Sequence, residues 1–130
     1  MATSQIPIEP LDPILNLWEI ECQMFTEHLK KSNPNVEFNL IPYKEFIYLD
    51  FISIAENHRN LGLGTKFMEQ LVILADSVNC PLALTPDTSY GARDEATLEN
   101  FYKRFGFIKN IGKDRDFSTM QTMIRPRKLL

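Results

Sequence analysis

The feature that most constrains this chain is a pair of glycines between an apolar strand and an apolar helix, in "FISIAENHRNLGLGTKFMEQLVILADS", residues 51–77. Gly62 and Gly64 are two of only five glycines in the chain. The first turn of a helix has unpaired N–H groups and a positive dipole end, so anions bind there. Glycines allow close approach to the backbone and positive φ angles, while Arg59 adds a cation and Thr65 a hydroxyl. The stretch therefore favours a phosphate-binding turn.

Two familiar phosphate loops are absent from this stretch. Lys66 follows Gly64 and Thr65, but no glycine stands at the distance that the pattern GxxxxGK[ST] requires. The dinucleotide pattern GxGxxG is not completed after Gly64. Two glycines alone leave a tight turn without a ligand as an equally good interpretation.

The composition predicts one domain over residues 1–130. Hydrophobic residues make up 44% and aromatic residues 11% of the chain, which is typical of globular proteins. No apolar run is long enough to cross a bilayer and "MATSQIPIEP" does not resemble a signal peptide, so we expect a cytoplasmic protein without membrane contact. Cys22 and Cys80 form neither a metal-ligand pattern nor a disulfide framework, so we expect reduced thiols and no metal.

The charge distribution bears on the ligand. The net charge of −3 argues against nucleic-acid binding. Acidic residues outnumber basic ones in residues 1–58, and the reverse holds in residues 59–130. An acidic front half suits a cationic ligand. On charge alone, ordinary surface variation is the better explanation.

Hydrophobic periodicity predicts the order helix, strand, strand, helix, strand, helix, strand, strand, which indicates a mixed α/β fold around one sheet. Asp12 can cap the first helix with Pro13 as its first residue, Pro42 and Tyr43 begin a turn, and Gly106 ends the third helix. The expected elements span residues 12–31, 36–41, 45–54, 63–77, 80–86, 93–105, 106–112 and 116–126.

Two blocks of this sequence resemble the GNAT superfamily of N-acetyltransferases. "RNLGLG" is similar to the family's motif A, Q/R-x-x-G-x-G/A, between a central strand and a long helix. "LENFYKRFGF" is similar to motif B, with Tyr102, Gly106 and Phe107 in the expected places. The resemblance covers roughly residues 45–125 and implies a mostly antiparallel sheet flanked by helices. Many members have two helices and an extra strand in the N-terminal half, so that half is expected to be reduced here.

The resemblance implies that acetyl-CoA is the cofactor. In the family, loop amides hold its pyrophosphate, and the pantetheine arm pairs with the backbone of the central strand as an added strand would. The pairing points to the main chain of Ile52 and Ile54. A separation between this strand and the "PLALT" strand would leave those groups free. The residues that match the pyrophosphate loop are Arg59, Asn60, Leu61, Gly62, Leu63, Gly64 and Thr65.

The family's chemistry requires a base for the attacking amine and an acid for the leaving thiolate. Tyr102 matches the family's common acid, and core packing is the alternative role for this residue. Asp50 is the only carboxylate in "FIYLDFISI". A carboxylate in an apolar strand favours a cleft, where burial would raise its pKa, so we expect Asp50 to be the base; a solvated edge is equally compatible. In the histone-type branch the base falls at Tyr48, on the same face of the strand.

The resulting prediction is an N-acetyltransferase that transfers acetyl from acetyl-CoA to a primary amine of a protein, peptide or small molecule by direct attack on the thioester. The alternative is a catalytically inactive GNAT-fold module that binds CoA or a protein. Glu95 favours the module, because family members often have Asn at this position to seat the cofactor arm. The reduced N-terminal half implies an open acceptor site or a partner chain that completes it, as in a homodimer.

Overall fold

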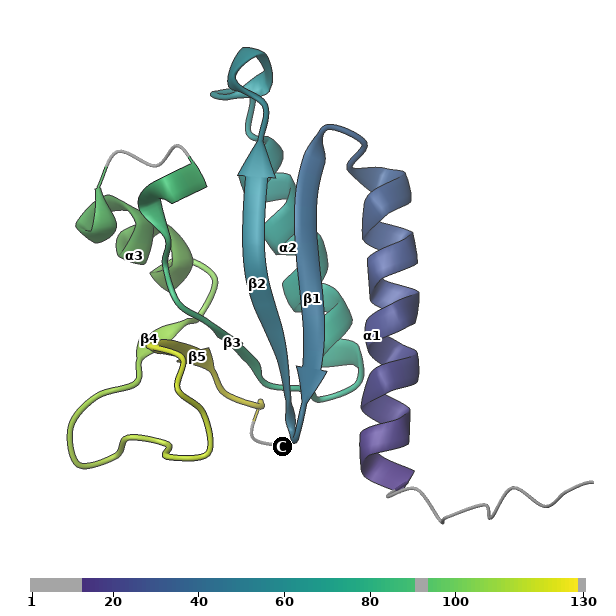
Figure 1. Cartoon of the computed structure of the whole chain (residues 1–130), viewed down its shortest axis with the longest axis vertical. Helices are drawn as coiled ribbons and strands as arrows, with labels where there is room; N and C mark the ends of the chain where they lie inside the picture. Colours follow the sequence, from purple (N-terminus) through teal and green to yellow (C-terminus); the bar gives the residue numbers. More distant parts are fainter. Residues whose placement is uncertain (1–12, 91–93, 129–130) are drawn as a thin grey trace, which may run out of the picture.

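The computed structural model describes residues 13–90 and 94–128 of the chain (Figure 1). The expected cap Asp12 therefore lies outside the described residues. The elements follow one another as α1 (Pro13–Ser32), β1 (Val36–Tyr43), β2 (Phe46–Ile54), the 3-10 helix η1 (Glu56–His58), α2 (Leu63–Ser77), β3 (Leu82–Leu84), the 3-10 helix η2 (Thr88–Tyr90), α3 (Glu95–Lys103), β4 (Ile108–Lys109) and β5 (Met123–Arg125).

The five strands form one sheet in the order β1-β2-β3-β5-β4. β1 with β2, β3 with β5 and β4 with β5 are antiparallel, and only β2 with β3 is parallel. A parallel pair needs a long crossover, which α2 supplies between β2 and β3. The predicted mixed α/β fold with a mostly antiparallel sheet and flanking helices is confirmed.

The core lies between the sheet and the helices α1 and α2. α1 packs along β1, α2 contacts both β1 and β2, and α3 lies on the opposite flank from α1 (Figure 1). Alternate residues of β1 point into the core. The side chains of Leu15 and Trp18 in α1 lie outside the described residues. The core residues from α1, β1 and α2 are Cys22, Phe25, Leu29, Val36, Phe38, Leu40, Phe67, Met68, Leu71 and Ala75.

One predicted turn was wrong. Pro42 and Tyr43 belong to β1, and the hairpin turn lies at Lys44, whose φ angle of 55° is left-handed, and Glu45. β1 is the outermost strand of the sheet. An edge strand accepts proline because one row of its N–H groups needs no partner in the sheet. The strand could therefore continue through Pro42.

The two closing strands are shorter than predicted, with two residues in β4 and three in β5. The segment between them is instead organised by the buried side chain of Asn110. Its Nδ2 donates to the carbonyl oxygens of Asp116 and Gln121 at 3.1 Å each, and its Oδ1 accepts from the Asp116 N–H at 2.7 Å. These bonds replace a longer β-ladder. No helix within the described ranges is long and apolar enough to span a membrane.

Candidate functional site

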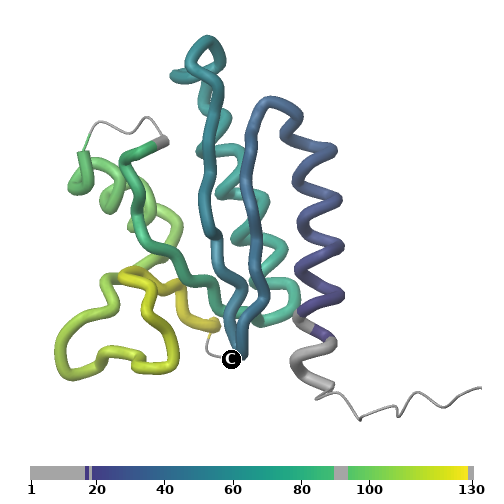
Figure 2. The backbone as a smooth tube through the Cα atoms, viewed as in Figure 1, coloured from purple at the N-terminus to yellow at the C-terminus, as the bar shows by residue number. Residues whose placement is uncertain are grey.

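The central strand β2 separates from its neighbour β3 partway along its length. Only Ile47–Leu49 pair with Leu82–Leu84, whereas β2 continues to Ile54. Figure 2 shows β3 leaving the side of β2 at this point, with residues 55–62 forming a loop at the far end of β2. Within the described part of the chain, the later part of β2 therefore has a strand partner only on its β1 side. The separation lies between β2 and the strand that contains "PLALT", the place where free backbone groups would be needed for a cofactor arm.

Asp50 lies in a bulge of β2. Asn39 of β1 pairs with Phe51 and Leu40 pairs with Leu49, so Asp50 is the extra residue. Its Oδ2 accepts a 3.3 Å hydrogen bond from Asn39 Nδ2, and its side chain is exposed. The expected burial of Asp50 is therefore wrong.

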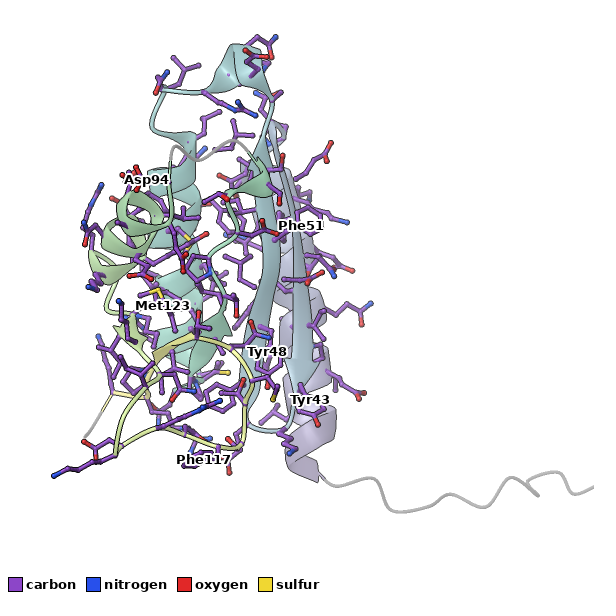
Figure 3. All side chains as sticks on the ribbon, turned by 60° about the vertical axis from the view of Figure 1, so that its left-hand side comes forward. Tyr43, Tyr48, Phe51, Asp94, Phe117 and Met123 are labelled. Carbon is purple, nitrogen blue, oxygen red and sulfur yellow. The ribbon has the colours of Figure 1, made fainter. Side chains whose placement is uncertain are left out.

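The bulge also affects Tyr48. The expectation that Tyr48 and Asp50 share a face assumed simple alternation, and the extra residue interrupts that alternation. Figure 3 shows Tyr48 near the hairpin end of β2, close to Tyr43, and Phe51 farther along the strand. Tyr48 also contacts the ring of Phe46. Its described neighbours are thus aromatic rings at the hairpin end.

A small pocket opens where β2 and β3 part. It has room for about one water molecule, at about 20 Å³. Residues from β2, from the end of β3 and from α3 meet there. The lining residues are Leu49, Asp50, Phe51, Ile52, Leu84, Thr85, Asp87 and Tyr102. The pocket brings together Asp50, Tyr102 and Ile52, which the sequence analysis selected separately.

Tyr102 is the buried residue of this pocket that has a titratable side chain. Its side chain is 4% exposed and packs edge-on against Phe101 and Phe107, with ring centroids 5.3 Å and 5.8 Å away. Its hydroxyl makes no hydrogen bond to any of the described residues. Burial, and secondly the negative charge of Asp87, raise the pKa of Tyr102 to about 12. At neutral pH this residue is a phenol with a free proton to donate.

Asp87 is a pocket residue that the sequence analysis missed. It follows β3 directly, in the turn that leads to η2, and η2 approaches β2 across the gap. Its Oδ1 accepts the N–H of Ser89 at 2.8 Å, and hydrogen bonds from Ser89 hold the pKa of Asp87 below its usual range. A signal existed, because ligands in open sheets bind beyond the carboxyl ends of the strands, where Asp87 stands.

The glycine loop joins β2 to α2 through two residues with left-handed backbone. Asn60 has a φ of 65° and Gly62, the N-cap of α2, a φ of 75°. The N–H of Lys66 bonds to the carbonyl oxygen of Gly62 at 3.0 Å. The three preceding helical N–H groups, from Leu63 to Thr65, lie before the first such bond, and no side chain caps them. They form the donor-rich helix end that a phosphate requires.

The two glycines serve different purposes. A Cβ atom on Gly62 would meet nothing within 4 Å, so a side chain there would occupy open space beside the helix end. A Cβ atom on Gly64 would contact Ile54 Cδ1 at 3.5 Å and Phe101 Cζ at 3.6 Å, which are ordinary distances. Gly62 is thus the residue whose positive φ requires glycine. Gly64 has room for a methyl group.

The sequence of this chain matches the model of a known protein family. The family model of the acetyltransferase (GNAT) family matches residues 32–107, more than half of the chain, from the end of α1 to Phe107. The chain belongs to the GNAT acetyltransferase family. The matched range contains β2, the glycine loop, α2 and the tyrosine of α3. No curated protein sequence matches the chain.

Two solved structures are similar to this chain. The crystal structure of the anti-CRISPR protein AcrVA5 aligns with a TM-score of 0.54 at 15% identity, over 70% of this chain and 90% of that one. A GNAT-family protein from Bacteroides thetaiotaomicron aligns with a TM-score of 0.45 at 23% identity, over 78% of this chain and 69% of that one. At 15% identity the likeness to AcrVA5 bears on the fold alone.

One position, residue 95, differs from the sequence pattern of the GNAT family. Glu95 is the exposed first residue of α3, directly after the cap Asp94, whose Oδ1 accepts the Thr97 N–H at 2.7 Å. An acidic residue is favourable in the first turn of a helix, so Glu95 has a structural reason to be there. Among residues 13–90 and 94–128, no three His, Cys, Asp or Glu side chains gather as a metal site.

Proposed function

We propose that this GNAT protein is an N-acetyltransferase that uses acetyl-CoA to acetylate a primary amine. The observation that carries the proposal is the opening between β2 and β3, with the pocket of Tyr102 at the point where the strands part. A thioester arm laid along the free side of β2 would bring its reactive end to this pocket.

The residues present fit the cofactor. The unpaired N–H groups from Leu63 to Thr65 and the open space beside Gly62 suit a diphosphate. Arg59 supports the loop beside them. The arm would pair with the main chain near Ile52. The main chain of Ile54 is less available to pair with the arm, because its carbonyl oxygen already accepts a hydrogen bond from Arg59 Nε at 2.9 Å.

The reaction forms a bond between the amine nitrogen and the acetyl carbon and breaks the carbon–sulfur bond. Asp50, at the exposed edge of the pocket, takes the amine proton through water, for which the pocket has room. Tyr102 donates its hydroxyl proton towards the leaving sulfur. Acetyl-CoA supplies the activated acetyl group, and the chain's residues orient it and manage the two protons.

A cofactor-binding module without catalysis is the second candidate, and Glu95 is the observation that favours it. A carboxylate at the start of α3 stands where the family often has a neutral amide. An ionised carboxylate cannot donate the hydrogen bonds that an amide offers to the cofactor arm.

The test mixes purified protein with acetyl-CoA and a panel of amines and measures free thiol release. Release above background that is lost in Tyr102→Phe supports the acetyltransferase. Binding of CoA without turnover on any amine supports the module, and absence of CoA binding refutes both.

A further inference from the structure

We propose that the free edge of β1 binds an extended peptide segment of a partner protein as an added strand, and that this segment alternates basic and apolar residues. β1 is the outermost strand of the sheet, with α1 packed beside it (Figure 1). This edge lies on the other side of β2 from the opening towards β3. The inference therefore goes beyond the acetyl transfer and does not depend on it.

β1 has a row of backbone groups that face away from the sheet. The N–H of Ile47 bonds to the carbonyl oxygen of Pro81 at 3.2 Å, so the backbone groups of Ile47 point towards the β3 side of β2. The partner of Ile47 in β1 is Pro42. Opposite residues of an antiparallel pair point either towards each other or both away, so Pro42 points outwards. Alternate residues share this direction, which adds Leu40, Phe38 and Val36 to the outward row.

Two residues of this row have N–H groups that an added strand can use. The N–H of Val36 already bonds to the carbonyl oxygen of Asn33 at 3.1 Å, and Pro42 has no N–H. The N–H groups of Phe38 and Leu40 face outwards without a hydrogen bond to any of the described residues. Free backbone groups at a sheet edge are a template for another strand, and edges are commonly protected by lysine. β1 contains no lysine or arginine.

A groove runs along this edge between β1 and α1, and we call it the edge groove. Its volume is about 390 Å³, many times the roughly 15 Å³ that one water molecule requires. Leu40 and Pro42 line it from the strand, and Glu19 and Glu27 line it from the helix. A second hollow of about 230 Å³ at the hairpin end shares Glu19 and Pro42 with it. The two spaces have room for the side chains on one face of an added strand.

The charge of the edge groove favours basic side chains. Glu19 and Glu27 are exposed, and neither takes part in an ion pair of the described residues. The cation at this edge is Lys44, which lies at the hairpin end over the ring of Tyr43 at 5.2 Å. Acidic surface residues alone are ordinary, but here they stand beside free main-chain donors. An added strand with lysine or arginine on its groove face is complementary to both features.

The opposite face of β1 favours apolar side chains. Ile41 is 38% exposed and Tyr43 is 49% exposed, and both lie on the face that points away from the core. Side chains of neighbouring strands that share a face pack against each other, and β-branched or aromatic pairs are favourable. The partner segment is therefore expected to alternate, with basic residues towards α1 and β-branched residues towards Ile41.

The test titrates isotope-labelled protein, without CoA, with the peptide acetyl-Lys-Val-Lys-Val-Lys-Val-amide and follows the backbone amides by NMR. Near saturation, we expect the amide protons of Phe38 and Leu40 to shift and to exchange with water about tenfold more slowly. The amides of Glu37 and Asn39, which face β2, are the internal control and should change less. Shifts confined to α1 would show general charge attraction and would overturn the proposal.

Three further peptides separate strand addition from other kinds of contact. Acetyl-Lys-Lys-Lys-Val-Val-Val-amide has the same composition without the alternation and should bind about tenfold more weakly. The other two keep the alternating sequence and carry N-methyl groups on either the lysine or the valine nitrogen atoms, so each lacks one row of donors. Because only one row of a strand can face β1, one of these peptides should bind and the other should not. Equal binding or equal loss for the two would refute strand addition.

Matched variants test the two faces of the site. The double variant Glu19→Gln with Glu27→Gln should weaken the alternating peptide about two- to fivefold, and Glu69→Gln on α2 should leave it unchanged. Ile41→Lys adds a cation at the edge and should weaken the peptide about tenfold, whereas Ile73→Lys, at an exposed site of α2, should not. Thermal unfolding confirms that each variant is folded. Wild-type affinity in both edge variants would contradict the assignment.

Sedimentation of the protein without peptide tests a second copy as the alternative occupant. We expect a monomer, whose edge is open to the peptide. A dimer that Ile41→Lys dissociates would show that β1 pairs with another copy of this chain, and the proposal of a peptide partner would then be wrong.

Discussion

Arg59 Nε donates a 2.9 Å hydrogen bond to the carbonyl oxygen of Ile54, which ties the glycine loop back to the last residue of β2. The bond spans η1 and holds the loop just before the left-handed residues Asn60 and Gly62. It also fixes which backbone groups of β2 remain for a cofactor arm. The arginine of the motif therefore organises the loop in addition to supplying charge.

Replacing Arg59 tests that double role. Arg59→Ala removes a charge-assisted hydrogen bond. Because the side chain is exposed, we expect the free energy of unfolding to fall by about 1 kcal/mol or less. CoA binding should weaken by about tenfold, because the charge near the diphosphate is lost as well. Calorimetric titration with CoA and thermal unfolding separate the two effects. Unchanged affinity with a reduced melting temperature would assign Arg59 to structure alone.

The glycines give a matched pair of variants. Gly62→Ala must hold alanine at a φ of 75°, which is unfavourable by about 1–2 kcal/mol, and it places a methyl group in the space beside the helix end. Gly64→Ala keeps ordinary contacts with Ile54 and Phe101 and should unfold at nearly the wild-type temperature. We expect Gly62→Ala to reduce both stability and CoA affinity. The same loss in Gly64→Ala would contradict the assignment of the strained position to Gly62.

Tyr102→Phe tests the proton donor. The thiol product has a pKa near 8.5, well below the pKa of about 12 for Tyr102, so the phenol stabilises the leaving sulfur mainly as a hydrogen-bond donor. We therefore expect kcat to fall about 10- to 100-fold, at or below the lower end for acid catalysis, with little change in KM. Thiol release at saturating acetyl-CoA measures it. Wild-type turnover in Tyr102→Phe would leave this tyrosine as a core residue.

The raised pKa of Tyr102 also affects how the stability and the activity of the protein depend on pH. The folded protein keeps this proton up to about pH 12, whereas an unfolded tyrosine loses it near 10. Stability from the neutral phenol is thus fully present below about pH 10 and is lost as the pH rises towards about 12. Between pH 7 and 10, activity should show no decline due to Tyr102.

Much of the fold could be predicted because the signals were local. The helix α2 follows from its apolar period and from the glycine that precedes it, and the predicted bounds, residues 63–77, agree with Leu63–Ser77. The strand β2 follows from its continuous apolar run. Both elements are determined by residues that are close together in the sequence, and hydrophobic periodicity reflects such local patterns directly.

The features that were missed depend on pairing between distant segments. The bulge at Asp50 arises from the register of β2 against Asn39 and Leu40, which neither strand shows alone. Pro42 stays in a strand because β1 is at the sheet edge. Asp87 reaches the pocket through the turn after β3, and its selection required knowing which strand lies beside β2.

A last relationship joins α2 to the C-terminal strand. Arg125 donates from Nη1 to Asp76 Oδ1 at 2.6 Å and from Nη2 to Oδ2 at 3.1 Å, and from Nε to the Phe105 carbonyl at 2.7 Å. Both side chains of the ion pair are largely buried, at 13% and 21% exposed. Lys128 reaches the same carboxylate at 3.2 Å but is 68% exposed. These contacts hold β5 beside the helix that carries the glycine loop.

Arg125→Ala should therefore lower the free energy of unfolding by about 1–3 kcal/mol at pH 7. Lys128→Ala, the matched control on the same carboxylate, should change it by less than about 1 kcal/mol. The hydrogen bonds from Arg125, and secondarily Lys128, hold the pKa of Asp76 below its usual value of 3.8. Their stabilisation is present above that value and is lost as the pH falls through the pKa of the folded state, so the gap between wild type and Arg125→Ala should narrow in acid. Urea unfolding at pH 7 and at about pH 3 measures it. A gap that stays constant with pH would show that Arg125 acts through its hydrogen bond to the Phe105 carbonyl and its contact at Gly106 rather than through the carboxylate.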